Sequence, residues 1–437
     1  MNHKKIFSIL TVSFFIKVGL ALFVPLFADE AYYYVWTQHP QLSYFDHPPM
    51  VSWFIFLGEK LFPFTNGLST RFIFIIGSII SMYVWARILK LKAFSDSAIF
   101  WFLILMQLNP LLGPGAIMAT PDLPLVLFWS LSYLFFLEAF NKRTYLAYAL
   151  LGVSLGLGFC SKYHIVLFVI SGLIYLIVSK KLRQVRPLGA LLTILFGLIF
   201  CLPVVWWNYQ NEWSSFAYQI NHGFVKNYYD WTWTPSFILS QVLILNPFLL
   251  TALFKKSDRA DKIFTLTQFL FFLSSSFKAV VEANWPITAH LHGAAVAATN
   301  LTEKRKNWAL GYWAVIYILF IGILFTPLGE NILKNQISSK DIEFLEPLVD
   351  QYQPLYGPSY QISSLLTWST GKTVNKLRGL SRHDFYDSLT VSIPTENEFY
   401  VLKHKNSIWP EAYVNFKITK IKDLEELNLE LFRMTHE

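Results

Sequence analysis

Residues 6–27 read IFSILTVSFFIKVGLALFVPLF, an apolar run interrupted by one charged residue, Lys17. A helix needs about 20 apolar residues to cross a hydrocarbon core of roughly 30 Å. Lys4 and Lys5 precede the run, as in a signal peptide, but the run is longer than a usual h-region and no small-x-small cleavage site precedes Asp29. We therefore expect a retained first membrane span.

The composition extends this expectation to most of the chain. The 437 residues are 54% hydrophobic and only 15% charged, with a mean hydropathy of +0.41. Soluble domains carry about 25% charged residues, so the composition predicts a polytopic all-α membrane protein. The eleven spans that we expect cover residues 6–27, 70–89, 97–112, 123–140, 145–160, 163–179, 188–206, 236–254, 263–277, 286–300 and 308–327.

The basic residues indicate orientation rather than a nucleic-acid partner, although the formal net charge is +8. With the N-terminus in the cytoplasm, eighteen basic residues fall in cytoplasmic loops and about five in the opposite loops, which follows the positive-inside rule. The loops expected on the outer side, in the periplasm of a bacterial inner membrane, are residues 28–69, 113–122, 207–235 and 278–285, followed by the C-terminal tail.

Two outer segments have compositions of their own. Pro48–Phe62 is apolar but too short to cross the membrane, so we expect a helix lying in the interface.

Residues 1–327 form the expected membrane domain, and the more polar tail, residues 328–437, is expected to be a small α/β domain on the outer side. In that tail LTVSIPTENEFYVLKH, residues 389–404, predicts two strands joined by a turn.

The stretch DEAYYYVWTQHPQLSYFDHPP, residues 29–49, carries the first candidate catalytic groups and is expected to be an outer active-site loop. Asp29 and Glu30 are either solvated acids at the end of a span or a general base with its neighbour in a partly desolvated pocket. Asp122 in ATPDLP is either a helix N-cap or a second acid at the same membrane depth. A second acid would suit a reaction that builds positive charge on a sugar carbon.

Basic groups on the same expected face suggest a phosphate site. Lys162 in FCSKYH either reaches to the interface by snorkelling or meets an anion, because an isolated lysine near membrane depth is costly. Lys278 presents the same choice, and His47 and His222 add two further donors. Several charge-assisted hydrogen bonds would hold a phosphate and stabilise it as a leaving group.

Other chemistries lack their motifs. The sequence has no Walker loop and no dinucleotide-binding glycine fingerprint, so a soluble nucleotide donor is not expected. The four histidines that stand nearest to candidate positions have no zinc spacing, and we expect neither a metal nor another cofactor. Those histidines are His39, His47, His290 and His292. The two cysteines, Cys160 and Cys201, lie inside apolar runs, and Lys17 is expected to pair with a carboxylate of the bundle.

Six motifs in order carry a family resemblance over roughly residues 20–300. They are the acidic pair at 29–30, YFDHPPM, ATPDLPL, GLGFCSKY, LPVVWWNYQNEW and EANWP. In this order they resemble bacterial members of the protein O-mannosyltransferase and aminoarabinose (lipid A) transferase group, within the GT-C glycosyltransferases. The resemblance implies transfer of a sugar from polyprenyl (undecaprenyl) phosphate to an acceptor at the outer face, with inversion at the anomeric carbon. The acceptor stays open between lipid A, another glycan and a protein.

The resemblance also assigns roles. It implies that Asp29 is the base, with Glu30 beside it, and that Asp122 is the second acid. Lys162 would bind the lipid phosphate together with His47 and Lys278; His47 stands where the lipid A aminoarabinose transferases have the lysine of YFEKPP. The further pocket residues that we expect are Tyr44, Asp46, His222, Asn284 and Trp285.

The alternative from another class is a flippase or transporter for lipid-linked sugars. Such a protein would need polar residues through the midplane and broken helices in paired halves. The polar residues gather on one face here, which favours the transferase. Turnover separates the two, because only an enzyme releases free polyprenyl phosphate.

Overall fold

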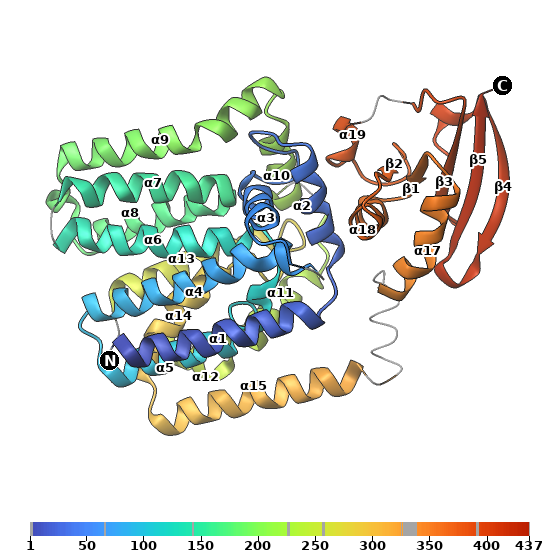
Figure 1. Cartoon of the computed structure of the whole chain (residues 1–437). Coiled ribbons are helices and arrows are strands. Elements are labelled where there is room, and N and C mark those ends of the chain that lie inside the picture. Colours follow the sequence, from blue (N-terminus) through green and yellow to red (C-terminus); the bar gives the residue numbers. More distant parts are fainter. Residues whose placement is uncertain are drawn as a thin grey trace. The chain divides into compact units, whose positions relative to one another are not determined.

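The computed structural model describes residues 3–64, 67–141, 144–224, 228–255, 258–324, 326, 339–389 and 393–436 (Figure 1). The α-helices are α1 (His3–Phe23), α2 (Ala28–Gln38), α3 (Met50–Leu61), α4 (Leu68–Leu91), α5 (Asp96–Leu108), α6 (Asp122–Asn141), α7 (Tyr145–Ser161), α8 (Val166–Val178), α9 (Pro187–Gln210), α10 (Ser214–Phe224), α11 (Trp233–Leu245), α12 (Pro247–Leu250), α13 (Arg259–Ser275), α14 (Ile287–Asn300), α15 (Glu303–Leu324), α17 (Ser339–Gln351), α18 (Tyr360–Thr370) and α19 (Tyr386–Leu389). The 3₁₀ turns are η1 (Pro114–Ile117), η2 (Tyr163–Ile165), η3 (Leu182–Gln184), η4 (Thr251–Phe254), η5 (Glu411–Tyr413) and η6 (Glu425–Leu427). The strands are β1 (Leu355–Gly357), β2 (Asn375–Lys376), β3 (Glu398–His404), β4 (Phe416–Leu424) and β5 (Leu429–His436).

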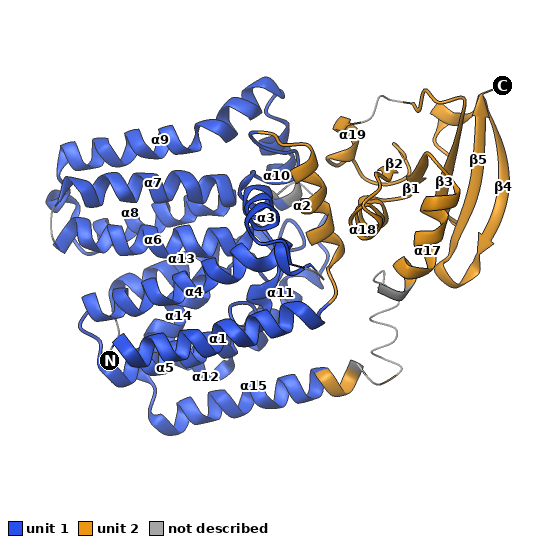
Figure 2. Cartoon of the chain, viewed as in Figure 1, with its two compact units in different colours: residues 1–24, 42–320 blue, residues 25–41, 321–437 orange. Residues whose placement is uncertain are grey.

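The chain divides into two compact units, coloured separately in Figure 2. Unit 1 comprises residues 1–24 and 42–320, and unit 2 comprises residues 25–41 and 321–437. The boundary near 320 lies close to the expected one at 327. Residues 25–41, which we expected in the membrane domain, pack instead with the C-terminal residues.

Unit 1 is a helical bundle in which every predicted span overlaps a helix. Five of the described helices are long and apolar enough to cross a membrane, or six if the bent pair α11 and α12 with η4 counts as one span. The chain is therefore an integral membrane protein, while the count of eleven crossings stays a prediction. The large side chains of α9 illustrate the lipid-facing surface, because many of them are exposed and apolar; among these are Leu191, Ile194, Leu198, Ile199 and Leu202.

Small residues let α7 and α9 approach closely. A Cβ added at Gly152 would lie 2.4 Å from the carbonyl oxygen of Thr193, and one added at Gly156 would lie 2.7 Å from that of Gly197. Such contacts allow backbone-to-backbone packing, which is how membrane helices associate in the absence of a hydrophobic driving force between them. The pair α7 and α9 therefore depends on these glycines.

The predicted span 236–254 is broken rather than straight. Its two halves meet at 93°, with Asn246 at φ 82° between them. Pro247 has no N–H for a continuing helix. The Asn246 side chain caps the second half by accepting from the N–H of Phe248 at 3.0 Å, and its amide donates to the carbonyl of Ala309 at 2.9 Å. Asn246 thus satisfies the polar groups that the break exposes.

The predicted outer loops contain helices. The loop at 28–69 holds α2 and α3, and the loop at 207–235 holds α10. The stretch 29–49 therefore is not a loop throughout: its first part is helical because the Glu30 carboxylate accepts from the N–H of Phe27 at 3.0 Å and caps the first turn. The short apolar helix expected at Pro48–Phe62 is confirmed as α3, which Figure 1 shows nearly end-on while α4 and α6 run across the view.

A buried polar network ties α4, α6, α13 and α14 together. Asp261 is fully buried and accepts hydrogen bonds from the Tyr133 hydroxyl at 2.9 Å and from Nδ1 of His292 at 3.0 Å, and it pairs with the Lys92 ammonium. Nε2 of His292 accepts from the indole N–H of Trp129 at 2.9 Å. Both ring nitrogens of His292 are therefore hydrogen-bonded inside the bundle core.

Replacing Asp261 by Ala is expected to destabilise unit 1 by about 2–5 kcal/mol, because it leaves the buried Tyr133 hydroxyl and His292 Nδ1 without their acceptor, while the Lys92 ammonium keeps Asp258 at 2.9 Å. The measurement is thermal unfolding of the purified protein in detergent. Glu138→Ala is the control, since Arg87 meets that carboxylate at 3.8 Å with half of its own side chain exposed. Equal unfolding temperatures for the two variants would contradict this account of the network.

Lys17 does not have the expected carboxylate partner within the described chain. Its ammonium is buried and donates to the Ser78 hydroxyl at 3.0 Å and to the Leu112 carbonyl at 3.3 Å. It therefore bridges α1, α4 and the segment before η1.

Unit 2 is built on a five-stranded mixed sheet in the order β2-β1-β3-β5-β4. β1 is parallel to β2 and β3, whereas β5 is antiparallel to β3 and β4. The expected small α/β domain is thus present. Of the two strands expected in residues 389–404, the second is confirmed as β3. Most of the first falls on residues 390–392, which lie outside the described chain; of its ends, Leu389 closes α19 and Ile393 is not in a strand.

The two faces of β3 bury different clusters. Phe399 and Val401 pack with Tyr413, Phe416 and Met434 on one face. Leu402 packs on the other, where the residues of α17 and α18 meet Leu26 and Ala31 from the segment 25–41. This second cluster explains why α2 belongs to unit 2: its apolar face is buried against α18.

Candidate active site

Asp122, Lys162 and Asn284 converge in unit 1 from three places far apart in the sequence. The Lys162 ammonium lies 2.7 Å from Oδ1 of Asp122, and the Asn284 amide donates to Oδ2 of Asp122 at 2.8 Å. Asp122 opens α6, Lys162 follows the last residue of α7, and Asn284 precedes α14. Lys162 can turn toward Asp122 because its backbone leaves the helix in an extended conformation, with φ −160° and ψ 138°.

This geometry decides between the alternatives left open for Asp122 and Lys162. Both side chains are more than nine-tenths buried. Lys162 therefore does not snorkel to the surface. The two carboxylate oxygens of Asp122 accept from the Lys162 ammonium and the Asn284 amide instead of capping α6. A carboxylate held by two donors is poorly suited to act as a base.

His164 is a residue that the sequence reasoning missed. It is half-buried and lies within electrostatic reach of both Lys162 and His47. Its Nδ1 has no hydrogen-bond partner among the described residues. The signal was available, because His164 follows Lys162 by two positions in FCSKYH. Its electrostatic contacts bring the expected phosphate ligands Lys162 and His47 into one neighbourhood.

An apolar cavity of about 370 Å³ opens beside this cluster. Five of its lining residues are polar or amphipathic: Tyr163, His164, Gln219, Ser275 and Trp285. The walls come mainly from α7, α8, α10 and α13, through Phe159, Leu167, Ile170, Phe216, Ile220 and Phe272. Trp285, which lines the cavity, directly follows Asn284, and His164 lies two positions after Lys162. The cavity therefore adjoins the charged cluster through residues that are neighbours in the sequence.

The other expected residues of unit 1 have different places. Tyr44 and Asp46 are buried; the Tyr44 hydroxyl lies 3.3 Å from that of Ser52, and the Asp46 carbonyl accepts from Gln219, which lines the cavity. Lys278 has an exposed side chain for which the described residues provide no contact, so the structure does not bring it to Asp122. The side chain of His222 lies outside the described part of the chain.

Asp29 and Glu30 belong to unit 2, at the start of α2. Asp29 is exposed within the described chain, and its Oδ1 accepts from the Tyr360 hydroxyl at 3.0 Å. Glu30 is fully buried and caps α2 through the N–H of Phe27. Of the two acids, Asp29 is the one whose side chain is exposed.

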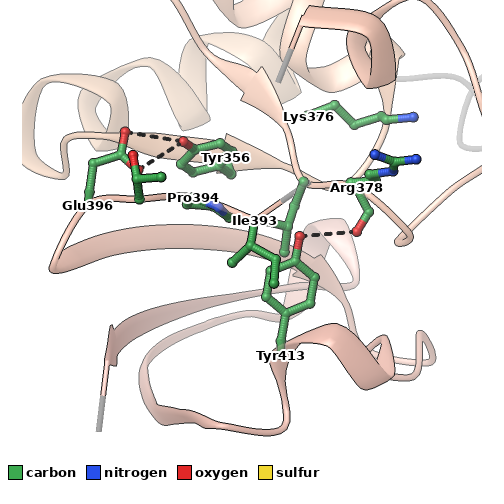
Figure 3. Close-up of a pocket in the computed structure, with 9 residues that line it drawn as sticks. Tyr356, Lys376, Arg378, Ile393, Pro394, Glu396 and Tyr413 are labelled. Atoms are coloured by element: carbon green, nitrogen blue, oxygen red, sulfur yellow. Dashed lines mark hydrogen bonds between the residues drawn. The ribbon is translucent and has the colours of Figure 1, made fainter. Parts of the chain in front are cut away.

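Unit 2 also has a small cavity of about 140 Å³, shown in Figure 3. Its polar groups bond mainly to one another: the Tyr356 hydroxyl donates to Glu396 at 3.4 Å, and that of Tyr413 donates to the Arg378 carbonyl at 3.3 Å. Lys376 points out of the cavity toward Asp384, at 2.8 Å. Burial is the main cause that raises the pKa of both tyrosines to about 12, so they remain donors. Within the described residues, no group of three or more His, Cys, Asp or Glu could hold a metal ion.

Comparison with known proteins gives the fold. Residues 46–207 match the family described as dolichyl-phosphate-mannose-protein mannosyltransferase, a segment that contains Asp122 and Lys162. The crystal structure of ArnT from Cupriavidus metallidurans bound to undecaprenyl phosphate superposes with a TM-score of 0.69 and 12% identity, covering 98% of this chain and 97% of ArnT. The chain has the fold of ArnT. Apo ArnT superposes over the same shares with a TM-score of 0.66 and 13% identity.

The chain also resembles a curated protein in sequence. The lipid A galacturonosyltransferase RgtD of Rhizobium johnstonii is 23% identical over 328 residues, which are 69% of this chain. The matched part spans 66% of RgtD, just under two thirds of its length.

Proposed function

We propose that this protein is an inverting glycosyltransferase that moves a sugar from undecaprenyl phosphate to an acceptor at the outer face of a bacterial inner membrane. The observation that carries the proposal is the buried Lys162, held by Asp122 and Asn284 and adjoining an apolar cavity. A lipid phosphate needs both parts, a cation for its head and an apolar channel for its chain. The fold shared with ArnT supports the same donor, because that protein binds undecaprenyl phosphate.

Each residue has a defined task in the proposed reaction. Asp29 takes the proton of the acceptor hydroxyl as its oxygen forms a bond to the anomeric carbon. The bond between that carbon and the phosphate oxygen breaks, and its electron pair stays on undecaprenyl phosphate. Lys162 meets the charge that develops on the phosphate, with His47 and His164 nearby and Asp122 as the residue that orients Lys162. One displacement inverts the configuration and leaves no covalent enzyme intermediate.

The proposed topology puts the N-terminus in the cytoplasm, with the loops around the site and the C-terminal unit in the periplasm. The positive-inside bias supports this orientation. Lipid A is the acceptor that we propose first, because RgtD is a lipid A glycosyltransferase. Tyr44, Asp46, His222 and Trp285 are the proposed pocket residues.

The experiment is turnover of purified protein in liposomes. The donors are undecaprenyl phosphate carrying galacturonic acid, mannose or 4-amino-4-deoxyarabinose, each offered with lipid A, and the products are read by mass spectrometry. We expect one donor to yield equal amounts of glycosylated lipid A and free undecaprenyl phosphate. If donor crosses the bilayer without release of undecaprenyl phosphate, the protein is a transporter and the proposal is wrong.

The proposed reaction needs no metal, because a lysine and two histidines are available to meet the leaving phosphate. Dialysis against EDTA is therefore expected to change turnover by less than about twofold, whereas the rate enhancement of a metal-dependent site would be lost on chelation. Turnover before and after dialysis, and after restoring Mg²⁺ or Mn²⁺, is the measurement. Recovery of a lost activity by added metal would contradict the expectation.

A further inference from the structure

Asp29 is tied to the C-terminal part of the chain by one well-formed hydrogen bond. The Tyr360 hydroxyl donates to its Oδ1 at 3.0 Å, although the two residues are 331 positions apart. Asp29 lies in the first turn of α2, and Tyr360 is the first residue of α18. Both helices belong to unit 2, and α2 and α18 pack on each other.

Aromatic packing fixes Tyr360 in this place. Its ring centroid lies 4.5 Å from that of Tyr32, which is one turn along α2 from Asp29. The hydroxyl of Tyr32 accepts from the N–H of Phe385 at 2.9 Å, so the loop before α19 is attached to the same helix. On that loop the Arg382 guanidinium lies 4.9 Å from the Tyr360 ring centroid, within cation–π range.

The Tyr360 hydroxyl stays a donor at any working pH. Its pKa is raised well above the ordinary tyrosine range, first by burial and then by the Asp29 charge, and Arg382 offsets only part of this rise. A neutral phenol beside a carboxylate gives a charge-assisted hydrogen bond that favours the ionised, proton-accepting form of the acid.

The other charged groups on the surrounding elements are engaged elsewhere. Glu30 caps α2. Lys376 is buried between Asp384, at 2.8 Å, and Asp387. His383 lies 3.7 Å from Asp387. Tyr360 donates directly to the Asp29 carboxylate, and Arg382 contacts the ring of Tyr360.

We propose that Tyr360, held by Arg382, is a positioning residue for the catalytic carboxylate of Asp29, which makes the C-terminal unit part of the catalytic apparatus. This inference rests on the proposed function, in which Asp29 is the base. Tyr360 fixes the direction of the carboxylate and keeps it ionised before the acceptor binds. Pre-orientation of this kind acts on kcat, because a general base works only within hydrogen-bond reach of the proton that it removes.

The test is the full-length Tyr360→Phe protein in liposomes, assayed with whichever undecaprenyl-phosphate sugar of the donor panel is turned over. We expect kcat to fall by about tenfold to a hundredfold, since one hydrogen bond to a charged group is lost, while KM for the donor stays within about twofold of the wild type. The acidic limb of the pH–kcat profile is expected to move toward higher pH. Arg382→Gln should give a smaller loss of kcat, and Arg382→Lys should restore part of it.

Tyr386→Phe is the matched control. Its ring is stacked with Tyr32 at 6.2 Å in the same aromatic cluster, and its hydroxyl lies 2.9 Å from that of Ser364. We expect its kcat and pH profile to match the wild type. An equal fall in kcat for both variants would mean that Tyr360 only supports the fold, and the inference would be wrong.

A double mutant separates this inference from the function on which it rests. If Asp29→Asn leaves a low residual turnover and Tyr360→Phe costs nothing further in that background, the two residues act together, as proposed. If Asp29→Asn is inactive but Tyr360→Phe has wild-type kcat and pH dependence, the positioning role alone fails. If Asp29→Asn is as active as the wild type, the assignment of the base fails first.

Discussion

Asp29→Asn is expected to reduce transfer by about 10²–10⁴-fold, the range in which a positioned general base contributes to catalysis. The amide keeps the size of the carboxylate and can still accept from the Tyr360 hydroxyl, so α2 and α18 should pack as before. It cannot take the proton of the acceptor hydroxyl. The loss should therefore appear in kcat, with donor affinity within about twofold of the wild type, because the phosphate is held by other residues.

The measurement is release of free undecaprenyl phosphate from the active donor by purified protein of matched thermal stability. Asp350→Asn is the control for the same substitution in the same unit, since that carboxylate is 68% exposed and pairs only with Lys372, at 2.7 Å, in the described structure. It should retain full activity. An Asp29→Asn protein with more than a third of the wild-type rate would remove Asp29 from the mechanism.

The parts of the fold that follow from local patterns could be predicted from the sequence. Apolar runs located the helices of the bundle, and the short apolar segment at 48–62 is a separate helix, α3. Asn246-Pro247 is a recognisable breaker pair inside the span 236–254, yet its effect was missed because the surrounding run is apolar throughout. The helix α2 was also missed, although Glu30 stands at the capping position of its first turn.

The candidate site, too, could be predicted only in part from the sequence. Asp122, Lys162 and Asn284 could be named from their motifs, but the contacts of Asp122 with Lys162 and Asn284 depend on packing across three elements. The contact between Asp29 and Tyr360 has no local signature at all, because it joins residues 331 positions apart through the packing of α2 on α18. A local sequence pattern predicts the secondary structure of a segment, whereas tertiary packing decides which residues contact one another across the fold.

Lys162→Met is expected to have two separable effects. Loss of the ammonium removes a charge-assisted contact to the lipid phosphate worth about 1.5–3 kcal/mol, so affinity for undecaprenyl phosphate should fall by about tenfold to a hundredfold. The same substitution leaves the buried Asp122 carboxylate with Asn284 as its remaining partner among the described residues, which is expected to cost about 3–5 kcal/mol of stability. Binding of radiolabelled undecaprenyl phosphate and thermal unfolding measure the two effects independently.

The double variant Lys162→Met with Asp122→Asn separates them further. Neutralising both partners removes the uncompensated charge, so most of the lost stability should return, while affinity and turnover should not. Lys60→Met, which removes an exposed ammonium 5.7 Å from the Phe56 ring, is the control and should leave both unchanged. If the double variant regains affinity for undecaprenyl phosphate together with stability, the Lys162–Asp122 pair is a structural ion pair and the phosphate must be held elsewhere. If only stability returns, Asp122 serves the reaction through the lysine that it holds.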